Sequence, residues 1–166
     1  MSSIFNPAAV QLELIEHQRI LANTQTVTFS NLNGDQDGVY LLVCRFRNGS
    51  ASVANYEVRP NGGTANQSHA RIASNGGTPA TNSGATMWLS AAPSNGSTVT
   101  FAVMQAEKSV ARGFTGVAFH SHGFMEVFGS HWNDTTNNIT SLDVRATVAN
   151  GIGANSTLTL YRVKSA

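Results

Sequence analysis

The sequence predicts an all-β protein: an antiparallel β-sandwich of jelly-roll type with a short N-terminal arm. The first observation is that Asn-Gly dipeptides occur six times, and this pair favours the type I′ turns of hairpins because both residues tolerate a positive φ. The second is that runs rich in Val, Thr, Phe, Tyr and Leu, which favour strands, lie between these turns. The third is the absence of any convincing helical repeat. The dipeptides begin at Asn33, Asn48, Asn61, Asn75, Asn95 and Asn150.

The composition indicates a single folded domain with a neutral polar surface. Its 166 residues predict one domain over residues 10–166, preceded by an arm of residues 1–9. Only 11% of the residues are charged, against about 25% in typical domains. Ser, Thr, Asn and Gly together account for 64 residues. Such a surface has weak long-range fields, so we expect partners to be recognised through shape and short-range hydrogen bonds.

The charge pattern and the hydropathy exclude two classes of partner. The net charge is +1, and the eight Arg residues are spread singly, whereas nucleic-acid binding needs a basic stripe. No stretch approaches the ~20 apolar residues of a membrane span. The N-terminus has neither the basic nor the apolar region of a signal peptide, so we expect no signal peptide here.

The first half of the chain predicts four strands. Residues 10–22 are ambiguous: Val10, Leu12 and Leu14 alternate as in a strand, while Leu14, Ile15, Gln18 and Leu21 approximate a helical stripe. The strand is preferred because everything downstream is β. Strands are then expected at residues 24–32, 39–47 and 53–59, with a turn at 33–38. The strand at 39–47 is apolar on both faces, which is typical of a central strand covered on both sides.

The second half begins with a loose segment. Residues 60–84 are interpreted either as long surface loops or as a contact surface ordered by a partner, around a short strand at 69–73. Residues 85–91 and 97–106 are expected to form a hairpin. Further strands are expected at residues 114–120, 123–129, 138–148 and 156–164, and the alternation within 138–148 is typical of a half-buried strand.

Few residues suggest chemistry. The single cysteine, Cys44, lies in an apolar run and is expected to be buried and inert. His120 and His122 share one face of a strand, so they could hold a metal ion with Glu126 or His131 as a third ligand. Gly123 directly follows them and favours a plain hairpin turn instead. Whether His120 and His122 bind a metal therefore stays open.

Two further patterns have a structural and a functional interpretation. Asn33, Asp35, Asp37 and Gly38 match the first half of a calcium loop, but Cys44 occupies the twelfth position, so a turn is preferred. Trp88 and Trp132 could form a sugar-stacking platform or could belong to the core. Serine nucleophile motifs, phosphate loops and dinucleotide glycines are absent from the sequence. We therefore expect no enzyme, no catalytic residue and no cofactor.

Two segments resemble the β-rich structural proteins of tailed bacteriophages. One comprises residues 29–47, with the run SNLNGDQDGVYLLVCRF, and the later YEVRPNG at residues 56–62. The other is WNDTTNNITSLDVRATVANGIGANSTLTLYRV at residues 132–163. They are similar to capsid decoration (cement) proteins and to related domains of tail and fibre proteins.

The resemblance implies a structural virion protein, made in the host cytoplasm and located on the capsid surface. Such a protein would form a homotrimer and bridge adjacent copies of the major capsid protein, so that many modest contacts resist the internal pressure together. The arm around Ile4, Phe5 and Pro7 would then contact the capsid or a neighbouring subunit. The alternative is a tail or fibre component that binds a receptor or glycan. A non-viral lectin and a small metal enzyme of cupin type are the remaining alternatives.

Overall fold

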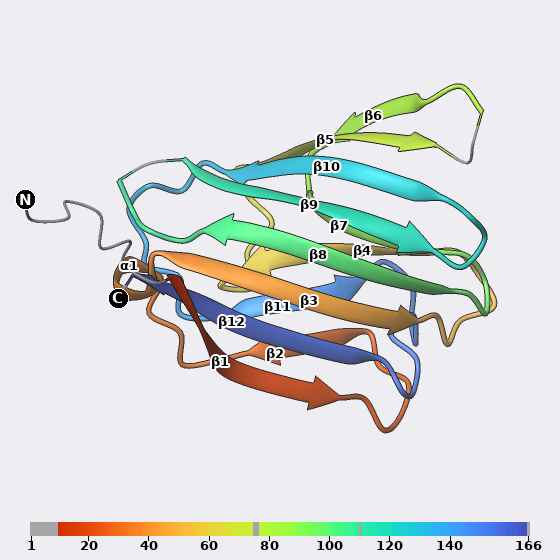
Figure 1. Ribbon diagram of the computed structural model, residues 1–166, viewed down its shortest axis with the longest axis horizontal. Helices are drawn as coiled ribbons and strands as arrows, with labels where there is room; N and C mark the ends of the chain where they lie inside the picture. The colour runs from red at the N-terminus through yellow and green to blue at the C-terminus, as the bar shows by residue number, and fades with distance from the viewer. Residues whose placement is uncertain (1–9, 75–76, 110, 166) are drawn as a thin grey trace, which may run out of the picture.

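The computed structural model describes residues 10–74, 77–109 and 111–165, and they form two antiparallel sheets packed face to face (Figure 1). The large sheet contains, in spatial order, β1 (Val10–Arg19), β12 (Thr157–Ser165), β3 (Val39–Arg47), β8 (Ser97–Gln105), β9 (Arg112–His120), β10 (Met125–Trp132), β5 (Gln67–Ser74) and β6 (Ala80–Gly84). The small sheet contains β2 (Thr26–Phe29), β11 (Leu142–Ala146), β4 (Ala54–Pro60) and β7 (Met87–Ala92). A one-turn helix, α1 (Gly34–Asp37), precedes β3.

The connectivity is that of a jelly roll with two inserted hairpins. If β5, β6, β9 and β10 are left out, the remaining eight strands, renumbered along the chain, have the order 1-8-3-6 in the large sheet and 2-7-4-5 in the small one. This is the strand order of a double Greek key jelly roll. The predicted antiparallel jelly-roll sandwich is therefore confirmed. Both inserted hairpins extend the large sheet beyond β8, so it is twice as wide as the small sheet.

The core lies between the two sheets and follows the alternation of the strands. In β11, Leu142 and Val144 are buried while Asp143 and Arg145 are not, as the sequence predicts. Phe46 of β3 and Tyr56 of β4 stack across the two sheets with ring centroids 3.9 Å apart. The Tyr56 hydroxyl donates a hydrogen bond of 2.8 Å to the Gly151 carbonyl, so this buried polar group is satisfied.

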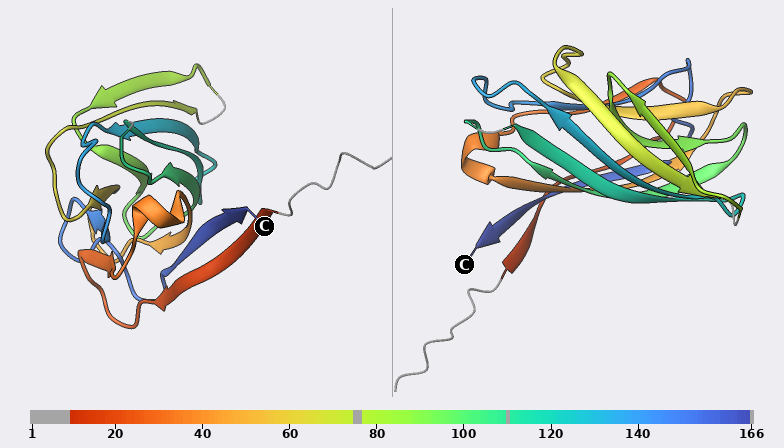
Figure 2. Two further views of the ribbon diagram at one scale, coloured as in Figure 1. Left: turned by 90° about the vertical axis from the view of Figure 1, so that its left-hand side faces the viewer. Right: turned by 90° about the horizontal axis from the view of Figure 1, so that it is seen from above.

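A bulge in β1 explains the ambiguous pattern of residues 10–22. The register with β12 shifts between Leu14 and Glu16, so Ile15 is an extra residue that packs against the core. The strand prediction is confirmed, and the bulge reverses the alternation at the point where the sequence resembles a helix. Figure 2 shows the start of β1 and the end of β12 bending away together from the rest of the sheet.

The Asn-Gly dipeptides mark chain turns, but the described ones do not form type I′ hairpins. The dipeptide Asn75-Gly76 lies outside the described residues. Of the five described dipeptides, only Asn61-Gly62 has a positive φ at both residues. That pair links β4 and β5, which belong to different sheets. The Asn48 side chain instead reaches the carbonyls of Ser52, Ala92 and Pro93. The asparagine of an Asn-Gly pair can therefore also be used for its side-chain hydrogen bonds, and the prediction of turns does not consider this role.

Three other expectations are wrong. Residues 60–84 are not mainly loops, because β5 and β6 form there and pair with each other and with β10. The strands β7 and β8 are not a hairpin, because the connection through Pro93 crosses from one sheet to the other. The strand β3 is not covered on both faces, because Leu41 and Val43 lie on an outer face without a further layer and are only half-buried. No helix in the described residues is long and apolar enough to cross a membrane.

Candidate functional site: the outer face of the large sheet

A continuous row of apolar side chains crosses the outer face of the large sheet. The register places Ile72 of β5, Val127 of β10, Val117 of β9, Phe101 of β8 and Val43 of β3 directly opposite one another on five adjacent strands. Residues directly opposite in neighbouring strands share a face and lie in side-chain contact distance. The row is therefore one connected apolar surface, contributed by both inserted hairpins and the jelly-roll core.

Most exposed large apolar residues of the described chain lie on this face. Eight of the ten belong to it, with exposed fractions of 44–55%. These eight, called here the apolar face, are Leu12, Leu14, Ile72, Phe101, Val103, Phe119, Met125 and Val127. At roughly 150 Å² for a full side chain, they present on the order of 600 Å² of apolar surface. That exceeds the ~450 Å² of apolar area that one partner contributes to a standard protein–protein interface.

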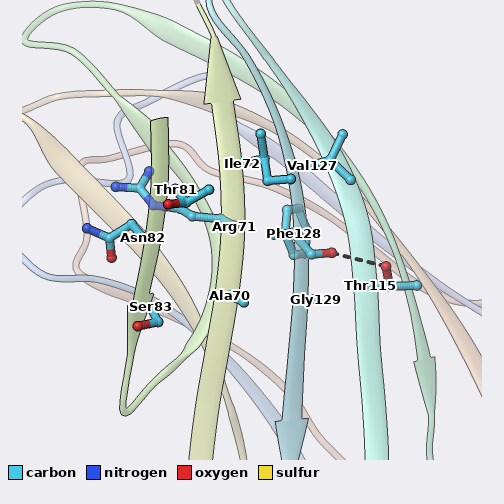
Figure 3. A pocket seen from close by; sticks show the side chains of 10 residues that line it. All are labelled: Ala70, Arg71, Ile72, Thr81, Asn82, Ser83, Thr115, Val127, Phe128 and Gly129. Atoms are coloured by element: carbon cyan, nitrogen blue, oxygen red, sulfur yellow. Dashed lines mark hydrogen bonds between the residues drawn. The ribbon is translucent and has the colours of Figure 1, made fainter. Parts of the chain in front are cut away.

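A second row explains why the face is hollowed. This row runs from Leu14 through Tyr161, Leu41 and Val103, but continues through Thr115, Gly129, Ala70 and Ser83 on β9, β10, β5 and β6. The side chains therefore shrink towards the β6 edge. A hollow of about 840 Å³ lies there, with Gly129 and Ala70 in its floor. Figure 3 shows Ile72 and Val127 at one end of it and Thr81, Asn82 and Ser83 along the β6 side.

The hollow is lined by neutral groups. Its polar side chains are the hydroxyls of Thr81, Ser83 and Thr115 and the amide of Asn82, and the Thr115 hydroxyl already donates to the Phe128 carbonyl at 3.0 Å. Arg71 also borders the hollow, but its guanidinium carbon lies 3.9 Å from the centre of the Trp88 ring on the inner side of the sheet. The hollow thus offers shape and hydrogen bonding rather than charge.

The inner side of the inserted strands holds a buried polar cluster around Glu126. This carboxylate is 1% exposed, pairs with Arg71 and accepts a hydrogen bond of 3.1 Å from the Trp88 indole. Nε2 of His120 lies 3.5 Å from it. Burial acts to raise the pKa of Glu126, but the contacts with His120 and Trp88 and the charge of Arg71 lower it below its ordinary value. The carboxylate is therefore charged at neutral pH, and its oxygens are used in contacts within the protein.

The structure separates the residues considered for a metal site. His120 ends β9, and His122 lies in the turn closed by the hydrogen bond from the Gly123 amide to the His120 carbonyl. Gly123 has a φ of 74° in this turn. Glu126 lies near His120, whereas His131 is on the outer face, in contact with Ser68. Across residues 10–74, 77–109 and 111–165, no three His, Cys, Asp or Glu side chains come together to hold a metal ion.

The calcium-like segment is occupied by protein contacts. Asp37 accepts hydrogen bonds from the Tyr40 hydroxyl at 2.6 Å and from Arg162 at 2.9 Å. Burial opposes ionisation of Asp37, yet these two donors hold its pKa below the ordinary value. Asp35 pairs with Lys108 at 3.0 Å. The preferred structural interpretation holds, although the segment forms the helix α1 rather than a simple turn.

Neither tryptophan is available for stacking on a sugar. Trp88 is 6% exposed and Trp132 is 5% exposed, and arginine side chains lie over both rings. The core interpretation of both is therefore correct. Cys44 is buried in β3, and burial raises the pKa of its thiol, in agreement with the predicted inert role. Ile4, Phe5 and Pro7 lie outside the described residues.

The sequence contains a signal for the apolar face that the prediction did not use. In β8, Val99, Phe101 and Val103 occupy one parity, while the buried Thr98 and Thr100 occupy the other. The apolar parity points outward here and the threonines point inward. The hollow has no such local signal, because it depends on which strands become neighbours.

Comparisons with known proteins give only remote likenesses. No protein-family model matches the chain, and no curated protein does. Among solved structures, the chain is similar to galectin LEC-6 of Caenorhabditis elegans, at 10% identity over 89% of this chain and 95% of that one, with a TM-score of 0.36. It is also similar to a mutant of alginate lyase Aly36B in complex with alginate tetrasaccharide, at 7% identity over 90% and 80% of the two chains, with a TM-score of 0.28. At these values the likenesses carry no argument about function.

Proposed function

We propose that this protein is a structural component of a bacteriophage virion that docks on the outside of the capsid through the apolar face and bridges major capsid proteins. The observation that carries the proposal is the continuous apolar row across five strands of a rigid sheet. A patch of about 600 Å² is at the upper end of the largest apolar patches on monomers, and such patches are often functional. The similarity of residues 29–47, 56–62 and 132–163 to phage virion proteins supplies the class of partner.

The chemistry of the face fits a protein surface rather than a charged ligand. Its exposed side chains are aliphatic, aromatic or thioether groups, and the row from Ile72 to Val43 contains no charged residue. Burial of ~600 Å² of apolar surface is worth about 15 kcal/mol before the costs of association are subtracted. A modest net affinity per copy is sufficient for a decoration protein, because copies joined as a homotrimer bind with avidity.

The test is co-sedimentation of the purified protein with capsid shells that lack it. We expect saturable binding, and we expect Phe101→Glu and Val127→Glu to abolish it, because each places a charge within the buried interface. Leu21→Glu is the matched control, because Leu21 is 85% exposed and lies outside the apolar face. Thermal unfolding of each variant verifies the fold. If wild-type protein stays in the supernatant, or if the two face variants bind like the control, the proposal is wrong.

The hollow at the β6 edge favours a second candidate, a tail or fibre component that binds a neutral glycan. Its floor of Gly129 and Ala70 and its rim of Thr81, Asn82 and Ser83 offer hydroxyl and amide groups to a neutral ligand. A Cβ added at Gly129 meets nothing within 4 Å, so we expect a larger side chain at this position, as in Gly129→Leu, to project into the hollow and fill it. Saturation-transfer NMR with neutral oligosaccharides from host cells would show binding that Gly129→Leu removes. Absence of saturation transfer with wild-type protein would eliminate this candidate.

A further inference from the structure

Three arginines gather at one end of the outer face of the large sheet. Arg45 and Arg47 follow Val43 on the outer side of β3, so their Cα atoms lie about 7 Å apart. Arg19 of β1 is directly opposite Thr157 of β12, which is itself directly opposite Arg45. Arg19 and Arg45 therefore share a face two strands apart, at about 10 Å. Figure 1 shows β1 and β3 ending at the same end of the sheet. The residues Arg19, Arg45 and Arg47 are called here the arginine end.

The arginine end makes no ion pair with the described residues. Arg19 donates a hydrogen bond of 2.8 Å to the side-chain oxygen of Asn155. The guanidinium groups of Arg45 and Arg47 are exposed and make neither a hydrogen bond nor an ion pair with any described residue. Charges within about one Debye length, ~10 Å, reinforce one another's field. The three arginines therefore form a local positive patch on a chain whose net charge is only +1.

The other basic residues are balanced within the chain. Five pair with carboxylates, Arg112 donates to backbone carbonyls, and Arg145 is directly opposite Glu57 on the small sheet. The five paired residues are Arg59, Arg71, Lys108, Arg162 and Lys164. Positive charge without a nearby counter-charge is thus concentrated at one place on the molecule.

A hollow of about 470 Å³ adjoins the arginine end. Arg45 and Arg47 line it together with His122, the hydroxyls of Ser97 and Ser121, and parts of the turns at residues 48–49, 95–96 and 153–154. No Asp or Glu of the described chain belongs to this lining. The hollow therefore offers two positive charges and several hydrogen-bonding groups to a partner that brings negative charge.

The arginine end continues directly into the apolar face. Val99 of β8 is directly opposite Arg45, and Phe119 and Met125 continue this row across β9 and β10. Protein–protein interfaces have this arrangement, with an apolar centre, a polar rim and an enrichment in arginine. A nucleic acid fits less well, because its phosphates need a longer basic stripe, whereas the row beyond Arg45 is apolar. The adjoining surfaces therefore indicate a protein that covers both.

A second copy of this chain lacks the carboxylates that would balance the arginine end. All nine acidic residues lie in the described part of the chain, and Glu107 is the one whose carboxylate makes no contact there. A single carboxylate does not neutralise three arginines. The eight that already hold contacts are Glu13, Glu16, Asp35, Asp37, Glu57, Glu126, Asp134 and Asp143. The negative charge must come from a different polypeptide.

We propose that the arginine end binds a pair of carboxylates on an extended segment of a different protein, and that this protein also covers the apolar face. Asp or Glu residues two apart in an extended chain lie on one side, about 7 Å apart, which matches the spacing of Arg45 and Arg47. Each guanidinium can hold a carboxylate through two parallel hydrogen bonds. The identity of this partner as a capsid protein rests on the proposed function, whereas the carboxylate chemistry does not.

The probe is an end-blocked peptide, Glu-Thr-Glu-Thr-Phe, titrated into the full chain and followed through the arginine Nε–H signals in NMR. At millimolar concentration it is expected to shift the signals of Arg45 and Arg47, and the shifts should diminish as salt is added. Gln-Thr-Gln-Thr-Phe should shift neither signal. Thr-Glu-Glu-Thr-Phe has the same charge but places its carboxylates on opposite sides when extended, so it should bind more weakly.

Arginine variants supply the matched comparison. Arg45→Gln combined with Arg47→Gln should weaken binding of the Glu-Thr-Glu-Thr-Phe peptide at least about tenfold, because hydrogen bonds between charged groups are lost. Arg145→Gln is the control, because Arg145 lies on the small sheet opposite Glu57. Both arginines of the double variant are exposed, so we expect it to unfold at the wild-type midpoint.

Four results would each overturn the proposal: no shift with the glutamate peptide, equal shifts with the glutamine peptide, equal binding of the two glutamate peptides, or an equal loss in the Arg145 variant. Tighter binding of a thymidine oligonucleotide than of the peptide at the same two signals would also overturn it, in favour of a nucleic acid.

Co-sedimentation with capsid shells separates this proposal from the proposed function. Arg45→Glu combined with Arg47→Glu should reduce shell binding and make the remainder insensitive to salt. If wild-type protein does not bind shells, the proposed function is wrong, and the peptide titration, which needs no capsid, decides the carboxylate site. If the double variant binds shells like wild type, the arginine end does not contact the partner of the apolar face, and the proposal is wrong.

Discussion

Arg112 is expected to be the most stabilising charged side chain of the described chain, and Arg112→Gln is the perturbation that tests it. The residue is fully buried at the start of β9, and its guanidinium carbon lies 4.9 Å from the centre of the Trp132 ring. Its nitrogens donate to the carbonyls of Ala106, Glu107, Asp134 and Asn137. One side chain thus fastens the β8–β9 connection to the β10–β11 connection.

The magnitude follows from the three donating nitrogens. A hydrogen bond from a charged donor contributes about 1.5–3 kcal/mol, and three give about 5–9 kcal/mol. Part of this offsets the desolvation of the buried guanidinium, and glutamine retains one donor group. We therefore expect Arg112→Gln to lower the free energy of unfolding by about 3–5 kcal/mol. At about 3 °C per kcal/mol for a domain of this size, Tm falls by about 9–15 °C.

The assay is urea unfolding followed by tryptophan fluorescence, with Arg45→Gln as the matched control. Arg45 lies on the same sheet but is exposed, so its replacement should change the free energy of unfolding by less than about 0.5 kcal/mol. Arg112→Lys should fall between wild type and Arg112→Gln, because a single ammonium cannot reproduce the fork. An Arg112→Gln variant within about 1 kcal/mol of wild type would refute the reasoning.

Three further predictions concern glycine, glutamate and cysteine positions. Gly116→Ala should destabilise the protein by about 1–3 kcal/mol, because the added Cβ would lie 2.2 Å from the Phe101 carbonyl oxygen. Gly129→Ala should be neutral, because its Cβ meets no atom within 4 Å, and equal unfolding midpoints for the two variants would contradict the prediction. The hydrogen bonds from Arg162 and Lys164 lower the pKa of Glu13 to about 2, so its contribution to stability is present above its ordinary pKa of 4.5 and is lost as the pH falls through about 2. A carboxyl NMR titration with a midpoint near 4.5 would contradict that prediction. Cys44 should not react with a thiol reagent until the protein unfolds, and rapid labelling of native protein would show that its burial is wrong.

The sequence predicts the elements well where alternation and burial agree. The strand at residues 39–47 has the predicted bounds, and β11 buries Leu142 and Val144 as its alternation indicates. The prediction fails where local preference and long-range pairing differ. Gly- and Asn-rich residues 60–84 have weak strand propensity, yet β5 and β6 form because they extend a sheet that already exists.

The candidate sites were less accessible to prediction. The cluster at Glu126 takes its members from β5, β7, β9 and β10, whose proximity depends on strand order rather than on spacing in the sequence. The spacing of the histidines alone suggests metal ligands. The spacing does not predict that one ring nitrogen of His120 lies beside the Thr98 hydroxyl and the other faces Glu126.

The pairing of β1 with β12 has a consequence for the order of folding. Glu13 and Arg162, which join these strands, are 149 residues apart in the sequence. Closing so long a loop is entropically costly, and β-proteins dominated by non-local pairs fold slowly. During synthesis, β1 cannot form this pairing until residues 157–165 have left the ribosome. Leu12 and Leu14 therefore reach their positions on the apolar face only after β12 is available, so a chain that lacks β12 cannot present the assembled surface.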